Sequence, residues 1–130
     1  MSLDEFSQAD QSRSIVLALL RTGFHIEAQV SPTTIVLRLR GELDMASGAS
    51  LRDAIASALE ANPLVLAIDL AHLTFVDSTG IRVLMGGSRR AAEAGCAFVL
   101  CAPRRPILKA LQLTGLDQVM VIETETPTLD

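Results

Sequence analysis

Hydrophobic and polar residues alternate in two segments in the first third of the chain. The alternation runs over residues 24–30 and again over residues 34–40, with the turn Ser31-Pro32-Thr33 between them. A period of two is typical of a strand with one buried face. Two such strands across a short turn predict a β-hairpin.

Three later segments repeat apolar residues at helical spacing. The first spans residues 46–61 and stops at Asn62-Pro63, since proline does not continue a helix. The second follows Gly80 and stops at Gly95, and the third starts within Pro103–Pro106 and closes at Thr114-Gly115. These stripes predict amphipathic helices. The apolar side expected for the second helix consists of Ile81, Leu84, Met85, Ser88 and Ala92.

Short apolar runs lie between these helices. Residues 64–68 form one run that Asp69 ends, residues 72–76 lead toward the second helix, and residues 97–101 and 119–122 form the last two. A continuous apolar run suits a strand that is covered on both faces. The element order β-β-α-β-α-β-α-β predicts an α/β fold with right-handed crossovers.

The length, charge and composition of the chain argue against several classes of function. A chain of 130 residues fits one domain. Its net charge of -4 disfavours binding to nucleic-acid backbones and to anionic lipids. Aromatic residues make up only 3% of the chain, which argues against a stacking platform for single-stranded nucleic acid. From the charge and the low aromatic content we expect no nucleic-acid partner. No apolar run reaches the length of a membrane helix, so we also expect no membrane insertion.

The two cysteines, Cys96 and Cys101, stand at the two ends of one apolar run. In a strand they lie on opposite faces and roughly 16 Å apart, which is too far for a disulfide. The chain has only two histidines, so a tetrahedral zinc site lacks ligands. Two buried free thiols suit a reducing compartment. We therefore expect a cytoplasmic protein with no metal and no cofactor.

Candidate chemistry centres on Ser78, which lies between a strand and a helix. A hydrolase nucleophile elbow needs glycine two residues before the serine, and Val76 occupies that position. Neither His25 nor His72 is placed in an order that indicates a catalytic triad. Asp77 or Ser78 is an ordinary helix cap on statistics alone. However, the carboxyl end of a strand in an α/β sheet is also where functional loops gather.

Three stretches together resemble the STAS domain family and, within it, the bacterial anti-sigma factor antagonists. They are Gly41-Glu42-Leu43-Asp44, Val65–Asp69 and Phe75-Val76-Asp77-Ser78-Thr79-Gly80-Ile81. The first of these is expected to be a loop that leads into a helix. The resemblance covers about residues 24–122, which is most of the chain.

The resemblance implies a small mixed sheet with helices on one side. It also implies a division of the chain into an N-terminal extension over residues 1–22, a STAS domain over 23–123 and a polar tail over 124–130. Residues 1–22 are expected to lie outside the family's usual domain, and their role is left open.

The resemblance further implies a regulatory binding protein with no catalysis of its own. Its expected partner is an anti-sigma factor that is also an ATP-dependent serine kinase. The unphosphorylated antagonist binds this kinase and frees a sigma factor. The kinase then phosphorylates the serine that corresponds to Ser78, and the complex dissociates. A serine phosphatase restores the first state.

The expected partner-binding residues flank the phosphoacceptor, and each has a structural alternative. They are Asp44, Glu42, Asp77, Thr79 and Gly80. Asp44 is equally explained as a cap for the helix near Ala46, and Glu42 as a solvated loop charge. Thr79 fits the first turn of a helix, and Gly80 fits the turn itself. The arginines at positions 82, 89 and 90 are expected to form a solvated helix face.

Two other functions remain as alternatives. A STAS scaffold subunit of a signalling or lipid-transport assembly needs no phosphorylation, and Ser78 is then only a helix cap. A small hydrolase uses Ser78 as its nucleophile. The presence of a hydroxyl at this turn favours the phosphorylated switch over the scaffold.

Overall fold

The computed structural model describes residues 23–129, so the expected extension over residues 1–22 lies outside the described part. The elements are β1 (His25–Val30), β2 (Thr34–Leu43), α3 (Gly48–Glu60), β3 (Val65–Val76), α4 (Ser78–Glu93), β4 (Ala97–Cys101), α5 (Arg105–Leu113), a 3-10 turn (Leu116–Gln118) and β5 (Val121–Glu123). This order confirms the predicted α/β succession. No helix in the described range is both long and apolar enough to span a membrane.

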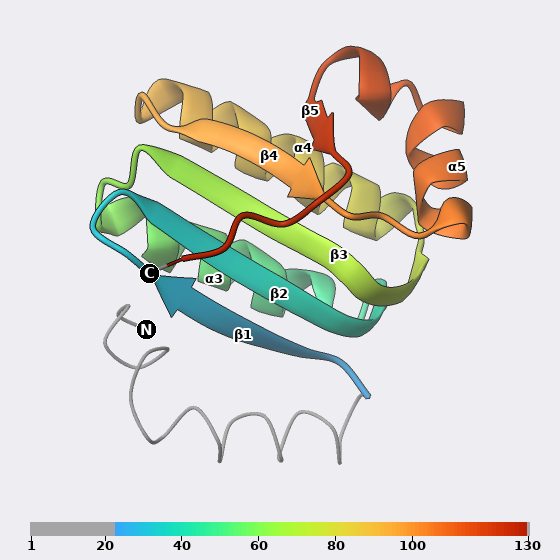
Figure 1. The fold of residues 1–130 in the computed structure, drawn as a ribbon. Helices are drawn as coiled ribbons and strands as arrows, with labels where there is room; N and C mark the ends of the chain where they lie inside the picture. The colour runs from blue at the N-terminus through green and yellow to red at the C-terminus, as the bar shows by residue number, and fades with distance from the viewer. Residues whose placement is uncertain (1–22, 130) are drawn as a thin grey trace.

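The five strands form one mixed sheet in the order β1-β2-β3-β4-β5 (Figure 1). The pair β1 and β2 is antiparallel, as the predicted hairpin requires. The pairs β2/β3, β3/β4 and β4/β5 are parallel, because a helix or a longer connection crosses between them. The carboxyl ends of β2, β3 and β4 therefore meet at one edge of the sheet.

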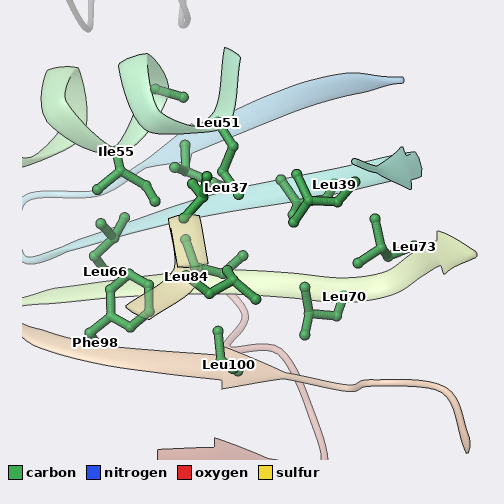
Figure 2. Close-up of a cluster of buried hydrophobic side chains, with 14 of the residues drawn as sticks. Leu37, Leu39, Leu51, Ile55, Leu66, Leu70, Leu73, Leu84, Phe98 and Leu100 are labelled. Atoms are coloured by element: carbon green, nitrogen blue, oxygen red, sulfur yellow. The ribbon is translucent and has the colours of Figure 1, made fainter. Parts of the chain in front are cut away.

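The helices α3 and α4 cover one face of the sheet, and the main core lies beneath them (Figure 1). Figure 2 shows side chains of α3 reaching toward alternate side chains of β2, β3 and β4. The core is aliphatic, with Phe98 as one of its few aromatic rings. Its largest fully buried side chains include Leu37, Leu51, Leu66 and Leu84. This packing confirms the expectation of helices on one side of the sheet.

The C-terminal segment after β5 runs over the opposite face of the sheet (Figure 1). Leu129 packs there against a small buried cluster formed by Val36, Ala67 and Cys101. The central strands are therefore covered on both faces, as their continuous apolar runs predicted. Cys96 belongs to the helix-side core and Cys101 to this second cluster, and both are buried free thiols.

The prediction that Asp69 ends a strand is wrong, since β3 continues to Val76. Asp69 is buried, and its Oδ2 accepts a hydrogen bond of 2.8 Å from Arg38 Nε. Its Oδ1 accepts a bond of 2.9 Å from the amide of Ala71, where the register of β2 and β3 shifts. The ion pair and the local hydrogen bond compensate for burying the carboxylate, so the strand can continue past Asp69.

The prediction of a loop at Gly41-Glu42-Leu43-Asp44 is also wrong for its first three residues, which belong to β2. Gly41 has a φ of 101°, and a Cβ there would collide with the backbone oxygen of Gly23. Glycine is therefore required for the strand to continue past this point. Leu43 ends the strand fully buried.

The buried side of α4 differs from the predicted one. Met85 is 37% exposed and Ala92 is exposed, whereas Gly87 and Ala91 are buried. A Cβ on Gly87 would lie 2.8 Å from Ile55 Cδ1 and 3.2 Å from the Phe98 ring. The helix therefore packs through its small residues, because these let α4 approach α3 and β4 closely. The apolar spacing alone favoured the larger Met85.

The last strand also begins later than predicted. Residues 116–118 form a 3-10 turn, and Val119 is 71% exposed rather than part of a strand. β5 covers only Val121–Glu123 and pairs with the end of β4. Leu116 and Met120 are buried and anchor this connection to the main core.

Candidate functional site

The two motif segments meet at the carboxyl ends of β2 and β3. Leu43 pairs with Val76 in the parallel register, and the amide of Asp77 donates a 3.1 Å hydrogen bond to the carbonyl of Leu43. The turn after β2 and the first turn of α4 are therefore neighbours. A Cβ on Gly48 would lie 3.4 Å from Thr79 Cγ2, so the starts of α3 and α4 also touch.

Asp77 is the N-cap of α4, and Ser78 is the first residue of the helix. The backbone of Asp77 is extended, and its Oδ1 accepts a 3.0 Å hydrogen bond from the amide of Gly80. Ser78 is exposed, and its hydroxyl has no hydrogen-bond partner within residues 23–129. Of the two alternative caps, the structure uses Asp77. The hydroxyl of Ser78 is consequently accessible from solvent.

The position of Ser78 is favourable for an added negative charge. α4 has 16 residues, and its N-terminal amides carry the positive end of the helix dipole. Phosphate groups are stabilised at such a terminus by these amides. The carboxylate of Asp77 is next to Ser78 in the chain, and Asp44 follows Leu43, whose carbonyl binds the Asp77 amide. Their negative charges act in the opposite direction. A phosphate on Ser78 would therefore be stabilised by the amides at the start of α4, while its surroundings would become strongly negative.

Gly80 is buried behind Ser78. A Cβ on this glycine would lie 2.8 Å from Leu43 Cγ and 2.9 Å from the Leu43 carbonyl oxygen. Gly80 thus lets the start of α4 lie directly on the end of β2. Thr79 is half-buried where it meets Gly48. These two residues position Ser78 and hold it at the surface.

Asp44 organises the turn before α3. Its Oδ1 accepts hydrogen bonds from the amides of Ala46 at 3.0 Å and Ser47 at 3.1 Å. The hydroxyl of Ser47 donates a 2.7 Å bond to the carbonyl of Glu42 and accepts a 2.9 Å bond from the amide of Asp44. Asp44 is therefore a cap for this turn, which was one of its two expected roles. The carboxylate is only half-buried, so part of it faces solvent.

Ser47 was not singled out from the sequence, although it is 2% exposed and holds the turn together. The signal was the spacing Asp44-x-x-Ser47, in which each side chain bonds to the other's backbone amide. This reciprocal arrangement belongs to the same class as helix capping boxes.

Glu42 is exposed at the end of β2, and its register partner on β3 is Phe75. Phe75 is 47% exposed and Met45 is 81% exposed. Sequence reasoning missed both as candidate contacts, because each was assigned to a strand or a loop without regard to its exposure. Large exposed apolar side chains beside a polar motif are typical of protein–protein contact sites.

The described residues do not assemble a Ser–His pair. His72 lies inside β3, opposite Arg40, four residues before Val76. Four residues of strand span about 13 Å, so His72 lies far from the start of α4. His25 lies on β1, also opposite Arg40. Neither histidine is within reach of Ser78, which leaves the nucleophile without a general base from these residues.

Comparisons with known proteins agree with this geometry. Residues 25–129 match the family model of the STAS domain. The anti-sigma F factor antagonist of Lysinibacillus sphaericus is 31% identical over 108 residues, which cover 82% of this chain and 92% of that protein. A crystal structure of an anti-sigma factor antagonist from Mycobacterium paratuberculosis matches with a TM-score of 0.70 at 27% identity, over 82% of this chain and 88% of that one.

The anti-sigma factor antagonist SpoIIAA is a third similar protein. Its unphosphorylated form matches with a TM-score of 0.64 at 26% identity, over 76% of this chain and 86% of that one. The structure of Bacillus SpoIIAA in its phosphorylated form matches with a TM-score of 0.59 at 28% identity, over 76% and 89%. The mixed five-stranded sheet, the helix order and the match over residues 25–129 lead to one conclusion: this chain belongs to the STAS domain family.

Proposed function

We propose that this protein is an anti-sigma factor antagonist that is switched by phosphorylation of Ser78. Its unmodified form binds an anti-sigma factor that is also a serine kinase, and a sigma factor is released. The proposal rests first on Ser78, an exposed hydroxyl without a partner in the described chain, at the start of a long helix. The antagonist names of the similar proteins, one of them solved in a phosphorylated form, support it.

The modification is a phosphoryl transfer that the partner catalyses. The Ser78 oxygen bonds to the γ-phosphorus of ATP held by the kinase, and the bond from that phosphorus to the bridging oxygen of ADP breaks. The hydroxyl proton passes to a base of the kinase, and ADP leaves. This chain contributes the oxygen, held outside the helix hydrogen bonds because Asp77 performs the capping. It is the substrate of the kinase and not an enzyme.

The phosphate then acts through charge. It adds about -1.5 to -2 charges at neutral pH. In the free protein, the N-terminus of α4 stabilises this charge. Against the surface of the bound kinase, the same group is desolvated beside Asp77, and the kinase surface supplies no matching cation. A cost of about 3 kcal/mol in the complex lowers the affinity roughly a hundredfold. The phosphorylated protein stays folded, and its complex with the kinase dissociates.

The contact surface proposed for the kinase surrounds Ser78. Asp44, Glu42, Asp77 and Thr79 contribute polar groups at its rim, and Gly80 keeps the helix start close to β2 so that the partner can approach. The exposed apolar side chains of Met45 and Phe75 add the hydrophobic contacts that such interfaces need. A serine phosphatase removes the phosphate and resets the switch. With these partners, the proposed place of action is the cytoplasm.

Phosphopeptide mapping tests the proposal. Wild-type protein, Ser78→Ala and the control Ser50→Ala are each incubated with γ-labelled ATP and a lysate of the source organism. Ser50 is a matched control because it is also an exposed serine in the first turn of a helix. We expect label on the Ser78 peptide in wild type and in Ser50→Ala, and none in Ser78→Ala.

The contrary result is equally clear. If the lysate phosphorylates a known substrate of an anti-sigma factor kinase while Ser78 stays unmodified, the switch is refuted. Ser78 is then an exposed helix residue of an unswitched STAS scaffold in a signalling or lipid-transport assembly.

A further inference from the structure

A groove between α3 and α4 gathers three arginines that the proposed function does not use. Arg52 comes from α3, and Arg82 and Arg90 come from α4. The hollow between them has a volume of about 150 Å³ and is open to solvent on one side. The remaining lining residues are Ile55, Thr79, Val83, Gly86 and Gly87.

These three guanidinium groups have no acidic partner in the described structure. The ion pairs within residues 23–129 join Arg38 to Glu27 and to Asp69, on the other face of the sheet. Arginine keeps its charge at any physiological pH, so the three groups repel one another across the groove. The chain as a whole is acidic, with a net charge of -4. A local cluster of unpaired cations in such a protein favours an anionic ligand at this place.

Two glycines of α4, Gly86 and Gly87, keep the groove accessible. Gly86 faces open space, since a Cβ there would meet nothing within 4 Å. Gly87 lies against Ile55 and Phe98, which brings the two helices close beneath the groove. The two glycines therefore add no side chain to the lining, and the arginines supply its charged groups. The sequence-based view of Arg82 and Arg90 as a solvated face did not include Arg52, which joins them only in the folded chain.

Size and lining identify the kind of anion. Sites for nucleotides and other small molecules usually measure 300–1,000 Å³ and carry apolar or aromatic contacts for the base. This groove is smaller, and none of its lining residues is aromatic. Carboxylate side chains fit the available space, and guanidinium groups bind them in a bidentate manner. An acidic peptide segment that lies along the groove can reach all three arginines.

We propose that this arginine groove binds an acidic segment of the partner protein. Naming the anti-sigma factor as that partner rests on the proposed function, but the acid-binding property of the groove does not. Thr79 lines the groove and adjoins Ser78, so both sites belong to one continuous surface. Arg82 also follows Ser78 by one helical turn, the spacing at which side chains on a helix meet. A phosphate on Ser78 therefore competes with the acidic segment for Arg82.

A peptide titration tests the groove directly. Isotope-labelled full-length protein with unmodified Ser78 is titrated with hexaglutamate at 50 mM salt, and backbone amide and arginine side-chain NMR signals are followed. We expect saturable shifts at Gly86, Gly87 and the groove arginines, and weaker binding at 200 mM salt. The double variant Arg52→Gln/Arg90→Gln is expected to bind about tenfold more weakly.

Arg89→Gln is the matched control, because Arg89 is an exposed arginine of the same helix that does not line the groove. It removes one charge and is expected to change the affinity less than about twofold. All variants change exposed side chains, and thermal unfolding verifies that they remain folded.

Three results would each overturn the proposal. They are shifts that avoid the groove, an equal loss of affinity in Arg89→Gln and in the double variant Arg52→Gln/Arg90→Gln, and tighter binding of ATP than of hexaglutamate at the same residues. Because the probe needs neither a kinase nor a phosphate, its failure leaves the Ser78 experiment untouched. A failure of that experiment likewise leaves the groove untouched.

Discussion

Either Asp77 or Ser78 could cap α4, and the structure assigns the cap to Asp77. The Asp77 carboxylate satisfies the amide of Gly80 and thereby closes the first turn of α4. Ser78 follows it in the helix with an exposed hydroxyl. Had the serine been the cap, its oxygen would have been engaged with the backbone and shielded from a kinase. A difference of one residue in the helix start therefore decides whether the serine is structural or available.

This division leads to a prediction about stability. Asp77→Ala is expected to lower the free energy of unfolding by about 1 kcal/mol, because an N-cap acceptor is lost. Ser78→Ala is expected to change it by less than about 0.5 kcal/mol, as exposed substitutions usually do. Urea unfolding of the two variants measures both values. Asp77→Ser serves as the control, since serine is also a good cap and recovers most of the loss. A larger effect at Ser78 than at Asp77 would contradict the assignment of the cap.

At the scale of elements, the site depends on β3 continuing beyond Asp69. The strand has 12 residues, and its last part carries the chain to Val76 beside the end of β2. Two shifts of register between β2 and β3 add residues to β3 along the way. Asp69 stabilises the first of these shifts through Arg38 and the amide of Ala71. A polar residue in the middle of an apolar run thus marks an irregularity inside a strand.

Asp69→Ala is accordingly expected to cost about 2 kcal/mol of stability, because Arg38 and the Ala71 amide each lose a partner. Arg38 is 29% exposed and regains some hydration, which keeps the cost below that of a fully buried pair. Denaturant unfolding gives the value. The control is Asp53→Ala on the exposed side of α3, where a change within about 0.5 kcal/mol is expected. Equal effects at the two aspartates would refute a structural role for Asp69.

At the scale of the whole molecule, the two faces of the sheet have different covers. The helix face is closed by α3 and α4 over a large aliphatic core. The other face is closed by the C-terminal segment, with Leu129 on the cluster of Val36, Ala67 and Cys101. Burial and, to a smaller extent, the negative charges of Asp69 and Glu123 together raise the pKa of the Cys101 thiol to about 11. The reactivity of Cys101 therefore reports on whether this segment is in place.

Removal of residues 124–130 is expected to expose Cys101. The pKa of its thiol falls when burial is relieved, and each unit of that fall raises the thiolate fraction about tenfold at pH 8. Reaction with a disulfide reagent should therefore become at least several-fold faster in the truncated chain. The measurement uses a Cys96→Ala background, so that Cys101 is the thiol observed. Unchanged reactivity after truncation would show that the segment does not protect this face.

Much of the fold follows from local patterns, because each pattern reflects an interaction between residues close in the chain. The alternation in residues 24–30 and 34–40 predicts the hairpin, and the spacing in residues 46–61 predicts a helix, which the structure has over residues 48–60. The motif around Ser78 identified the candidate site, since it lies between a strand and a helix, where functional loops of α/β sheets gather. The resemblance to the family came from this motif together with Gly41-Glu42-Leu43-Asp44 and Val65–Asp69.

Other features depend on residues that are distant in the sequence. Which side of α4 is buried was decided by Ile55 and Phe98, against which only a small residue such as Gly87 fits. The polar C-terminal segment covers one face of the sheet, because its Leu129 packs against an apolar cluster on that face. The groove joins Arg52 to Arg82 and Arg90 only because α3 and α4 lie side by side.

By itself, the sequence determined the type and order of the elements and the place of Ser78 at a helix start, because these depend on periodicity and turn chemistry within a few residues. Only the tertiary structure decided that Asp77 is the cap, that Asp69 is satisfied inside a strand and that three arginines share one groove. Those outcomes depend on contacts between separate elements, and such contacts exist only when the sheet brings the elements together.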